Sequence, residues 1–266
     1  MRKILITGGS GFIGSYLKRH LDEDVYFPSS SELDLTNFIN VSRYLDNNFD
    51  VIIHSAVYGR DNLYDTDGTI LYKNLSMFVN LFANKHKYKK FINFGSGAEF
   101  GLSNNISKVS GICNLIPLES YGASKNIISK IINDADNFHN VRIFSCFDPS
   151  ESNKRFISKF KEKVLNKETI LLNNNRYMDY ISLEDLTIII RCIMDGKIED
   201  RTINAVYEEK YLLSDILYKL CKVVGLNSNL IVLNDTLGLE YTGCGKSLAE
   251  KKLNLNGLEK GLKKYV

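Results

Sequence analysis

The stretch Thr7-Gly8-Gly9-Ser10-Gly11-Phe12-Ile13-Gly14 follows the apolar run Ile4-Leu5-Ile6 near the start of the sequence. Glycines at 8, 11 and 14 that end a strand and open a helix have the layout of a dinucleotide-binding turn. Gly8 would allow the tight bend, Gly11 the close approach of a pyrophosphate, and Gly14 the contact between helix and sheet. A helix from about Phe12 to His20 would hold the phosphates at its N-terminus. We therefore expect a dinucleotide cofactor bound by Gly8, Gly11, Phe12, Ile13 and Gly14.

Short apolar runs alternate with segments of helical periodicity along the first part of the sequence. We expect strands near residues 3–7, 24–27, 50–53, 90–95 and 140–144, with helices between them. This alternation predicts an α/β fold, a doubly wound, Rossmann-like parallel sheet with helices on both faces. After Pro149 the elements become shorter, with helices expected over 154–166 and 214–224 and an extended segment over 202–205.

The composition is that of an ordinary globular protein, with 266 residues, 44% apolar and 24% charged, and a net charge of +3. The basic residues are scattered, so the sequence gives no indication of nucleic-acid binding. The five cysteines have no paired spacing, which argues against a zinc site or a disulfide scaffold. The N-terminal apolar run is too short for a signal peptide, and Arg191 interrupts the apolar segment over 188–194. We expect a cytoplasmic protein without metal or membrane segments.

Tyr121 and Lys125, within Tyr-Gly-Ala-Ser-Lys, are the strongest candidates for catalysis. Residues four apart on a helix share one face, so the ammonium of Lys125 can lie close to the phenol of Tyr121. A free tyrosine has a pKa of about 10, and a neighbouring cation lowers it. Alone, such a pair is most often found on the surface of a helix. Following a dinucleotide-binding turn, it predicts a proton-transfer site.

Taken together, these residues resemble the extended short-chain dehydrogenase/reductase family, in its nucleotide-sugar branch. The segment Phe91 to Gly101, Phe-Ile-Asn-Phe-Gly-Ser-Gly-Ala-Glu-Phe-Gly, resembles the strand and loop that carry the family's catalytic Ser or Thr. Ser96 lies five residues before Gly101 and twenty-five before Tyr121, where that serine belongs. The resemblance implies a catalytic triad of Ser96, Tyr121 and Lys125. An ordinary turn serine among glycines is the alternative for Ser96.

Other landmarks of the family fall in the expected order. Asp34-Leu35 resembles the segment that contacts the adenine, although Asp34 could instead cap the helix expected near Asn37. His54-Ser55-Ala56 resembles the family's turn beneath the cofactor, with Ser55 and Ala56 as contacts and His54 as a packed residue at a strand end. Asn74 matches an asparagine of the following helix, where a surface amide is the alternative.

The turn after the second strand bears on the choice of cofactor. NAD-binding domains place a carboxylate there to bind the ribose hydroxyls. Here the segment is Pro28-Ser29-Ser30-Ser31, and Glu32 and Asp34 come later. Hydroxyls and backbone amides can donate to a 2′-phosphate, so the sequence favours NADP(H), with Ser29 and Ser30 as contacts. NAD(H) remains the alternative.

The resemblance implies three reactions on a nucleotide-diphosphate sugar. Dehydratases of the family follow the catalytic serine or threonine with Asp-Glu, whereas this sequence has Gly97-Ala98, and Glu99 comes one position late. The dehydratase is therefore disfavoured. The missing carboxylate after the second strand favours a 4-keto reductase using NADPH over a C4 epimerase with tightly bound NAD. In the reductase, Tyr121 would donate the proton, Lys125 would tune the phenol, and Ser96 would bind the carbonyl oxygen. A non-catalytic NADP-binding sensor or scaffold is the alternative from another class.

The resemblance implies a dinucleotide-binding domain over 1–148, to which elements near 179–205 return, and a region over 149–266 that is mostly a small substrate-binding lobe. Ser145 stands where the family often has a sugar-binding asparagine. The usual diphosphate-binding arginine is absent before Asp179, so Arg155 and Arg176 are the candidates, with surface arginines as the alternative. Ser96, Gly97 and Ser145 would contact the sugar. Family analogy also implies a homodimer packed through the helices that carry Asn74 and Tyr121.

Overall fold

The computed structural model describes residues 1–59, 65, 68–225, 231–233 and 237–265. The chain divides into two compact units, each of which is formed by separate stretches of sequence. The first unit comprises Met1–Ser103, Gly111–Arg142 and Ile190–Ile203, and the second comprises Asn104–Ser110, Ile143–Ile189 and Asn204–Val266. The expected boundary at residue 148, with 179–205 returning to the first domain, stays a prediction.

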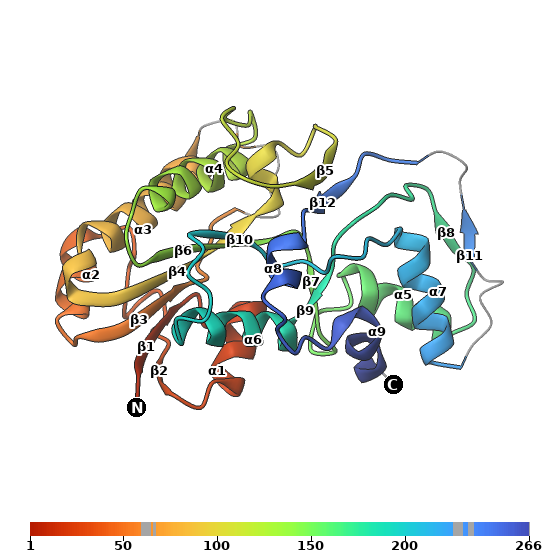
Figure 1. The fold of residues 1–266 in the computed structure, drawn as a ribbon, viewed down its shortest axis with the longest axis horizontal. Coiled ribbons are helices and arrows are strands. Elements are labelled where there is room, and N and C mark those ends of the chain that lie inside the picture. Colours follow the sequence, from red (N-terminus) through yellow and green to blue (C-terminus); the bar gives the residue numbers. More distant parts are fainter. Residues whose placement is uncertain (60–64, 66–67, 226–230, 234–236, 266) are drawn as a thin grey trace. The chain divides into compact units, whose positions relative to one another are not determined.

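The first unit is built on a six-stranded sheet with the order β10-β6-β4-β3-β1-β2 (Figure 1). Its strands are β1 (Lys3–Thr7), β2 (Asp24–Tyr26), β3 (Phe49–His54), β4 (Tyr88–Ser96), β6 (Phe138–Ile143) and β10 (Thr202–Asn204). β1 pairs in parallel with β2 and β3, and β3 with β4. The predicted α/β, Rossmann-like class is confirmed, and each of the five expected strands is present within two residues of its expected ends.

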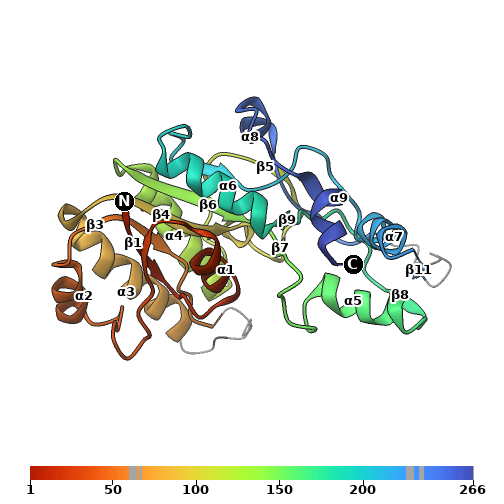
Figure 2. The same ribbon diagram turned by 90° about the horizontal axis from the view of Figure 1, so that it is seen from below.

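Helices cover both faces of this sheet (Figures 1 and 2). α2 (Phe38–Leu45), α3 (Thr69–Ala83) and α4 (Ser120–Asn133) lie on one face. α1 (Phe12–His20) and the last turn of α6 (Leu183–Met194) lie on the other, where Arg191 donates to the carbonyl oxygen of His20 at 2.7 Å. Two 3-10 turns, η1 (Lys85–Lys87) and η2 (Gly97–Phe100), precede and follow β4.

The core of the first unit lies between the sheet and the helices α2, α3 and α4. Ile52, Phe78 and Phe91 are fully buried, and the rings of Phe91 and Phe138 stack at 4.9 Å. Central strands covered on both faces need near-continuous apolar sequence, which the runs Ile4-Leu5-Ile6 and Val51-Ile52-Ile53 provide. The rigid sheet therefore fixes the positions of the polar residues at its strand ends.

Two glycines make the turn after β1 sterically feasible. Gly8 has a φ of +71°, and a Cβ there would lie 2.7 Å from the Ala56 backbone. A Cβ on Gly14 would lie 2.3 Å from the carbonyl oxygen of Gly8, so the first turn of α1 packs directly on the loop. The expected helix from Phe12 to His20 has those bounds in the structure.

The second unit consists of short strand pairs and helices. Its pairs are β12 (Tyr241–Gly243) with β5 (Ile106–Val109), β7 (Cys146–Phe147) with β9 (Ile181–Ser182), and β11 (Ile231–Leu233) with β8 (Ile170–Leu172). Its other elements are α5 (Phe156–Leu165), α7 (Leu213–Val223), α8 (Lys246–Glu250), α9 (Gly257–Leu262) and η4 (Lys263–Tyr265). The helices expected near 154–166 and 214–224 are thus confirmed as α5 and α7. None of the helices in the described part of the chain is long and apolar enough to span a membrane.

Thr7 and His54 form a cross-strand pair at the carboxyl ends of β1 and β3. The Thr7 Oγ1 and the His54 Nδ1 lie 2.8 Å apart, and the amide of Ala56 donates to Thr7 Oγ1 at 3.3 Å. Burial, together with the positive charge of Lys125, lowers the pKa of His54 to about 3. His54 is therefore a neutral, packed residue, as expected for a histidine at a strand end.

This burial predicts a pH dependence of stability. His54 binds a proton in the unfolded chain below about pH 6.5 but stays neutral in the folded chain, so stability falls as pH decreases through this window. As the pH falls from roughly 6 to 4.5, the free energy of unfolding should decrease more steeply for the wild type than for His54→Asn. The difference between the two slopes should be up to about 1.4 kcal/mol per pH unit. Urea unfolding at several pH values measures this difference. His86→Asn, at an exposed histidine, is the control, and equal slopes for wild type and His54→Asn would contradict the prediction.

Candidate active site

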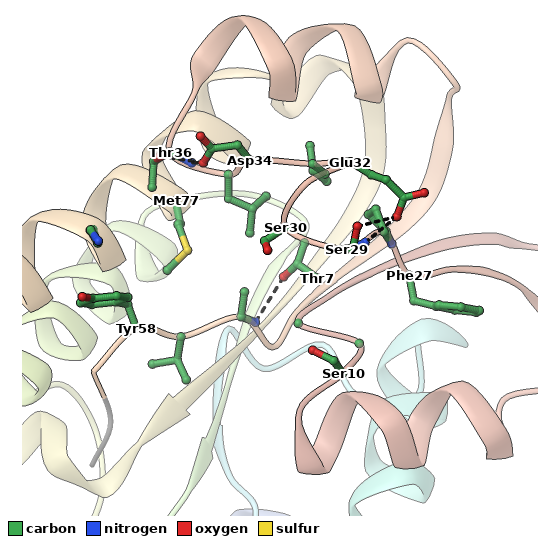
Figure 3. Close-up of a pocket in the computed structure, with 18 of the residues that line it drawn as sticks. Thr7, Ser10, Phe27, Ser29, Ser30, Glu32, Asp34, Thr36, Tyr58 and Met77 are labelled. Atoms are coloured by element: carbon green, nitrogen blue, oxygen red, sulfur yellow. Dashed lines mark hydrogen bonds between the residues drawn. The ribbon is translucent and has the colours of Figure 1, made fainter. Parts of the chain in front are cut away.

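A pocket of about 670 Å³ opens at the carboxyl ends of β1, β2 and β3, within the first unit (Figure 3). In open α/β sheets, ligands bind at this edge. The volume lies in the range of small-molecule sites. The lining residues come from the glycine turn, the segment after β2, the segment after β3 and α3: Thr7, Gly8, Gly9, Ser10, Lys18, Phe27, Pro28, Ser29, Ser30, Glu32, Leu33, Asp34, Leu35, Thr36, Ala56, Val57, Tyr58, Lys73 and Met77.

Of the expected cofactor contacts, Gly8, Ser29, Ser30, Asp34, Leu35 and Ala56 line this pocket. Gly11, Phe12, Ile13, Gly14, Ser55, Asn74, Tyr121 and Lys125 do not line it. Gly11 to Gly14 form the start of α1 immediately after the lining turn, and the amide of Ser55 donates to the carbonyl oxygen of Thr7 at 3.2 Å. The contacts proposed for these residues stay predictions.

The segment after β2 differs in one respect from the sequence interpretation. Glu32 turns back so that its Oε2 accepts hydrogen bonds from the amide and the hydroxyl of Ser29, both at 2.8 Å (Figure 3). These bonds lower the pKa of Glu32, so its carboxylate is ionised at neutral pH. A carboxylate therefore lies in the pocket beside Ser29, although it comes three residues later in the sequence.

Asp34 faces the pocket and does not cap α2. Its Oδ1 accepts from the amide and hydroxyl of Thr36, at 2.9 and 2.7 Å, and these bonds lower the pKa of the carboxyl group (Figure 3). The cap of α2 is Asn37, whose side chain accepts from the amide of Asn40. The capping alternative for Asp34 is therefore wrong.

Asn74 is buried behind the pocket wall rather than exposed on α3. Its Oδ1 accepts from the amide of Tyr58 at 2.9 Å, and its Nδ2 donates to the carbonyl oxygen of Tyr58 at 3.1 Å. Tyr58 itself lines the pocket. Asn74 thus fixes the backbone of a lining residue, and the surface-amide alternative is wrong.

Two lysines of the pocket were missed by sequence reasoning. Lys18 Nζ lies 3.6 Å from the centre of the Phe27 ring, and Lys73 Nζ lies 4.0 Å from that of Tyr58. Helical spacing could have indicated Lys18, because it follows Gly14 by four residues and so shares the face that packs on the glycine turn. Both lysines line the pocket, which also holds the carboxylates of Glu32 and Asp34.

Ser96 ends β4, and η2 follows it directly. The hydroxyl oxygen of Ser96 accepts from the amide of Ala98 at 3.2 Å. Lys125, on α4, donates from Nζ to the carbonyl oxygen of Phe94 at 2.7 Å, and the same Nζ lies 5.9 Å from the centre of the Tyr121 ring. The lysine is therefore fixed to the strand that carries Ser96 while it remains beside Tyr121.

The turn of Ser96 and the helix of Tyr121 meet backbone to backbone. A Cβ on Gly122 would lie 2.6 Å from the carbonyl oxygen of Ala98, so only glycine allows this approach. Asn126 adds a link from the same helix, since its Nδ2 donates to the carbonyl oxygen of Glu99 at 3.0 Å. The first unit thus brings together the elements that carry Ser96, Tyr121 and Lys125.

The expected substrate residues of the second unit have structural partners. Arg155 donates to Glu151 at 2.9 Å and to the carbonyl oxygen of Cys146 at 2.5 Å, and its guanidinium is largely buried. The carbonyl oxygen of Ser145 accepts from the amide of Ile181, while Arg176 contacts the sulfur of Met178 at 3.8 Å. Their roles toward a substrate stay predictions, as does that of Gly97, which is buried in η2.

Metal chemistry has no evident site in the described residues, which include no group of three or more His, Cys, Asp and Glu that could hold an ion.

Comparison with known proteins connects this geometry to a family. Residues 4–205 match the model of the NAD dependent epimerase/dehydratase family. A curated relative, GDP-6-deoxy-D-talose 4-dehydrogenase of Aggregatibacter actinomycetemcomitans, is 26% identical over 242 residues, which cover 83% of this chain and 80% of that protein.

Solved structures share the fold over almost the whole chain. GDP-mannoheptose C4 reductase from Campylobacter jejuni with NADP bound is 19% identical, with a TM-score of 0.75 and coverage of 99% of this chain and 96% of that one. dTDP-4-dehydrorhamnose reductase from Bacillus anthracis in complex with NADP is 18% identical, with a TM-score of 0.78 and coverage of 99% and 97%. dTDP-glucose 4,6-dehydratase from the same species, with NAD, is 15% identical, with a TM-score of 0.78 and coverage of 100% and 95%.

The family match spans most of the sequence and includes the glycine turn, the pocket and the elements of Ser96, Tyr121 and Lys125. The chain belongs to the NAD dependent epimerase/dehydratase family.

Proposed function

We propose that this protein is an NADPH-dependent reductase of a 4-keto sugar linked to a nucleoside diphosphate. The observation that carries the proposal is the packing of η2 on α4, which gathers Ser96, Tyr121 and Lys125 in the unit that holds the dinucleotide pocket. A GDP-linked 6-deoxy sugar is the first substrate to test, because the curated relative is a GDP-6-deoxy-D-talose 4-dehydrogenase. Oxidation of that sugar at C4 gives a 4-keto sugar, which the reverse reaction would reduce.

When bound, the cofactor would supply a hydride for reduction of the C4 ketone. Tyr121 donates a proton to the oxygen as the carbonyl becomes an alcohol. Lys125 holds the tyrosine in a positive field, and its bond to the Phe94 carbonyl fixes the ammonium on the Ser96 strand. Ser96 stabilises the developing negative charge by hydrogen bonding, with its oxygen oriented by the bond from the Ala98 amide.

The residues after Ser96 argue against a dehydratase. Elimination needs a further acid and base, and Gly97 and Ala98 offer neither. Glu99 has a carboxylate, but its side chain is 1% exposed and its Oε2 accepts from Arg142 at 2.6 Å. A carboxylate turned into the protein cannot reach a bound sugar, so Glu99 does not replace the missing pair.

One observation favours a second candidate, a C4 epimerase that retains NAD. The ionised carboxylate of Glu32 lies in the pocket beside Ser29, where it would accept from ribose hydroxyls and repel a 2′-phosphate. Lys18 in the same pocket attracts that phosphate. We favour NADP(H) because Lys18 provides a cation and Ser30 a hydroxyl donor.

Two further features of the sequence interpretation belong to this proposal. A cytoplasmic enzyme of this kind would meet NADPH and sugar nucleotides together.

A homodimer through α3 and α4 is supported by the exposed Tyr72 and Val79 of α3, which are 71% and 48% exposed.

Substitution of the proposed proton donor tests the reaction. Tyr121→Phe keeps the ring and removes only the hydroxyl, so NADPH should bind as in wild type while turnover falls by at least about a hundredfold. The measurement is NADPH absorbance at 340 nm with the GDP-linked 6-deoxy-4-keto sugar, with binding followed by NADPH fluorescence. Tyr44→Phe, at a tyrosine of α2, is the control. Wild-type turnover by Tyr121→Phe would reject the assignment.

Removal of a pocket cation tests the choice of cofactor. Lys18→Ala should raise the KM for NADPH by about ten- to a hundredfold, the loss expected for one charge-assisted phosphate contact, and change the KM for NADH by less than about twofold. Lys73→Ala is the matched control, because Lys73 lies beside Tyr58 and contributes a positive charge near Asp34. Equal effects of Lys18→Ala on both cofactors would contradict a 2′-phosphate contact.

A further inference from the structure

A buried polar network surrounds the side chain of Glu99, a residue of η2. Glu99 is at its centre: Oε2 accepts from Arg142 Nε at 2.6 Å, and Oε1 accepts from Asn140 Nδ2 at 3.0 Å. Glu99 and Arg142 are each 1% exposed, and Asn140 is 0% exposed. Asn93 extends the network by donating to Asn140 Oδ1 at 2.7 Å.

The backbone of β4 leaves room for this network. A Cβ on Gly95 would lie 2.6 Å from Glu99 Oε1 and 2.5 Å from Asn140 Oδ1. Any larger residue at position 95 would therefore displace the carboxylate of Glu99. The glycine, the acid and the amide together form one packed arrangement, so the position of Glu99 is specified by its surroundings.

The network contacts both elements that carry the proposed catalytic groups. Toward the serine, Glu99 Oε1 accepts from the amide of Ser96 at 3.3 Å and closes a capping box with the bond from the Ala98 amide to the Ser96 hydroxyl. Toward α4, Ser129 accepts from Arg142 Nη2 at 3.3 Å and from Asn140 Nδ2 at 3.0 Å. Ser129 lies one helical turn after Lys125.

Stability alone does not account for such a pair. Apolar residues of similar volume often replace a buried ion pair without loss of stability, whereas removal of one partner leaves an uncompensated charge. The particular property of Glu99 is that its hydrogen bonds link three elements, β4, β6 and α4. They do so next to Ser96, whose hydroxyl must be correctly oriented. Sequence reasoning treated Glu99 only as a misplaced acid.

We propose that Glu99, held by Arg142 and Asn140, is a positioning residue that fixes the Ser96 hydroxyl relative to Tyr121 and Lys125. The inference rests on the proposed function, since it concerns the same site. Glu99 touches neither cofactor nor sugar, and acts through the turn that it closes. A shift of Ser96 would weaken its hydrogen bond to the carbonyl oxygen in the transition state more than it would weaken binding of the substrate.

The test is one substitution made in two backgrounds, wild type and Ser96→Ala. Glu99→Gln keeps the size of the side chain and removes its charge. In the wild-type background it should lower kcat by about ten- to a hundredfold, less than the loss of a whole oxyanion donor. The Kd of NADPH, measured by fluorescence, should change by less than about twofold, because the pocket residues are untouched. In the Ser96→Ala background the same substitution should lower kcat by less than about twofold, because a residue that acts through Ser96 has nothing left to position.

Two further variants separate positioning from folding. Glu99→Leu/Arg142→Met removes both charges together, so it should melt near the wild-type temperature and still turn over slowly. Asp179→Asn breaks another buried ion pair of the described residues, with Lys210 in the second unit, and should lower the melting temperature while kcat is kept. All rates are measured well below the melting temperatures, with NADPH and the GDP-linked 6-deoxy-4-keto sugar.

The outcomes are distinct. Wild-type kcat in Glu99→Gln, recovery of kcat in the double variant, or equal losses in the two backgrounds would overturn the positioning role while leaving the reductase proposal intact. A wild-type protein that reduces no 4-keto sugar nucleotide with NADPH would reject the proposed function, and this inference with it. Loss of kcat only where Ser96 is present supports the inference.

Discussion

The contact between Gly122 and the carbonyl oxygen of Ala98 is the constraint on which the site depends. A side chain at position 122 would separate α4 from η2, because its Cβ would lie 2.6 Å from that oxygen. With glycine, the helix that carries Tyr121 and Lys125 packs on the turn that begins at Ser96. The Lys125 bond to the Phe94 carbonyl and the Asn126 bond to the Glu99 carbonyl then fix the helix to the same strand and turn. The chemistry proposed for this site therefore depends on the close approach of the α4 and η2 backbones, which Gly122 permits.

Much of the first unit could be predicted because its signals are local. The run Ile4-Leu5-Ile6 followed by glycines at 8, 11 and 14 predicts a strand, a tight turn and a helix, and the structure has these elements with the steric requirements for Gly8 and Gly14. Apolar runs bounded by polar residues are also local signals, and they identify the central strands. The roles proposed for Ser96, Tyr121 and Lys125 came from resemblance, since spacing alone does not distinguish them from surface residues.

The remainder depends on contacts between residues far apart in the sequence. Glu32 enters the pocket because its side chain folds back on Ser29, which no periodicity reveals. The pairing of β5 with β12 joins segments more than a hundred residues apart, and it draws Asn104–Ser110 into the second unit. From the sequence alone Glu99 is only an acid displaced by one position, because its contacts with Arg142 and Asn140 form only in the folded chain. Such side chains acquire their environment only from the folded chain.

Transfer of a labelled hydride tests the central claim most directly. NADPH that carries deuterium at the transferable C4 position of its nicotinamide is incubated with the protein and the GDP-linked 6-deoxy-4-keto sugar, and the product is examined by NMR. A reductase gives one deuterium at C4 of the sugar for each NADP⁺ formed. An unlabelled product, or no consumption of NADPH while the sugar is converted, would contradict the account.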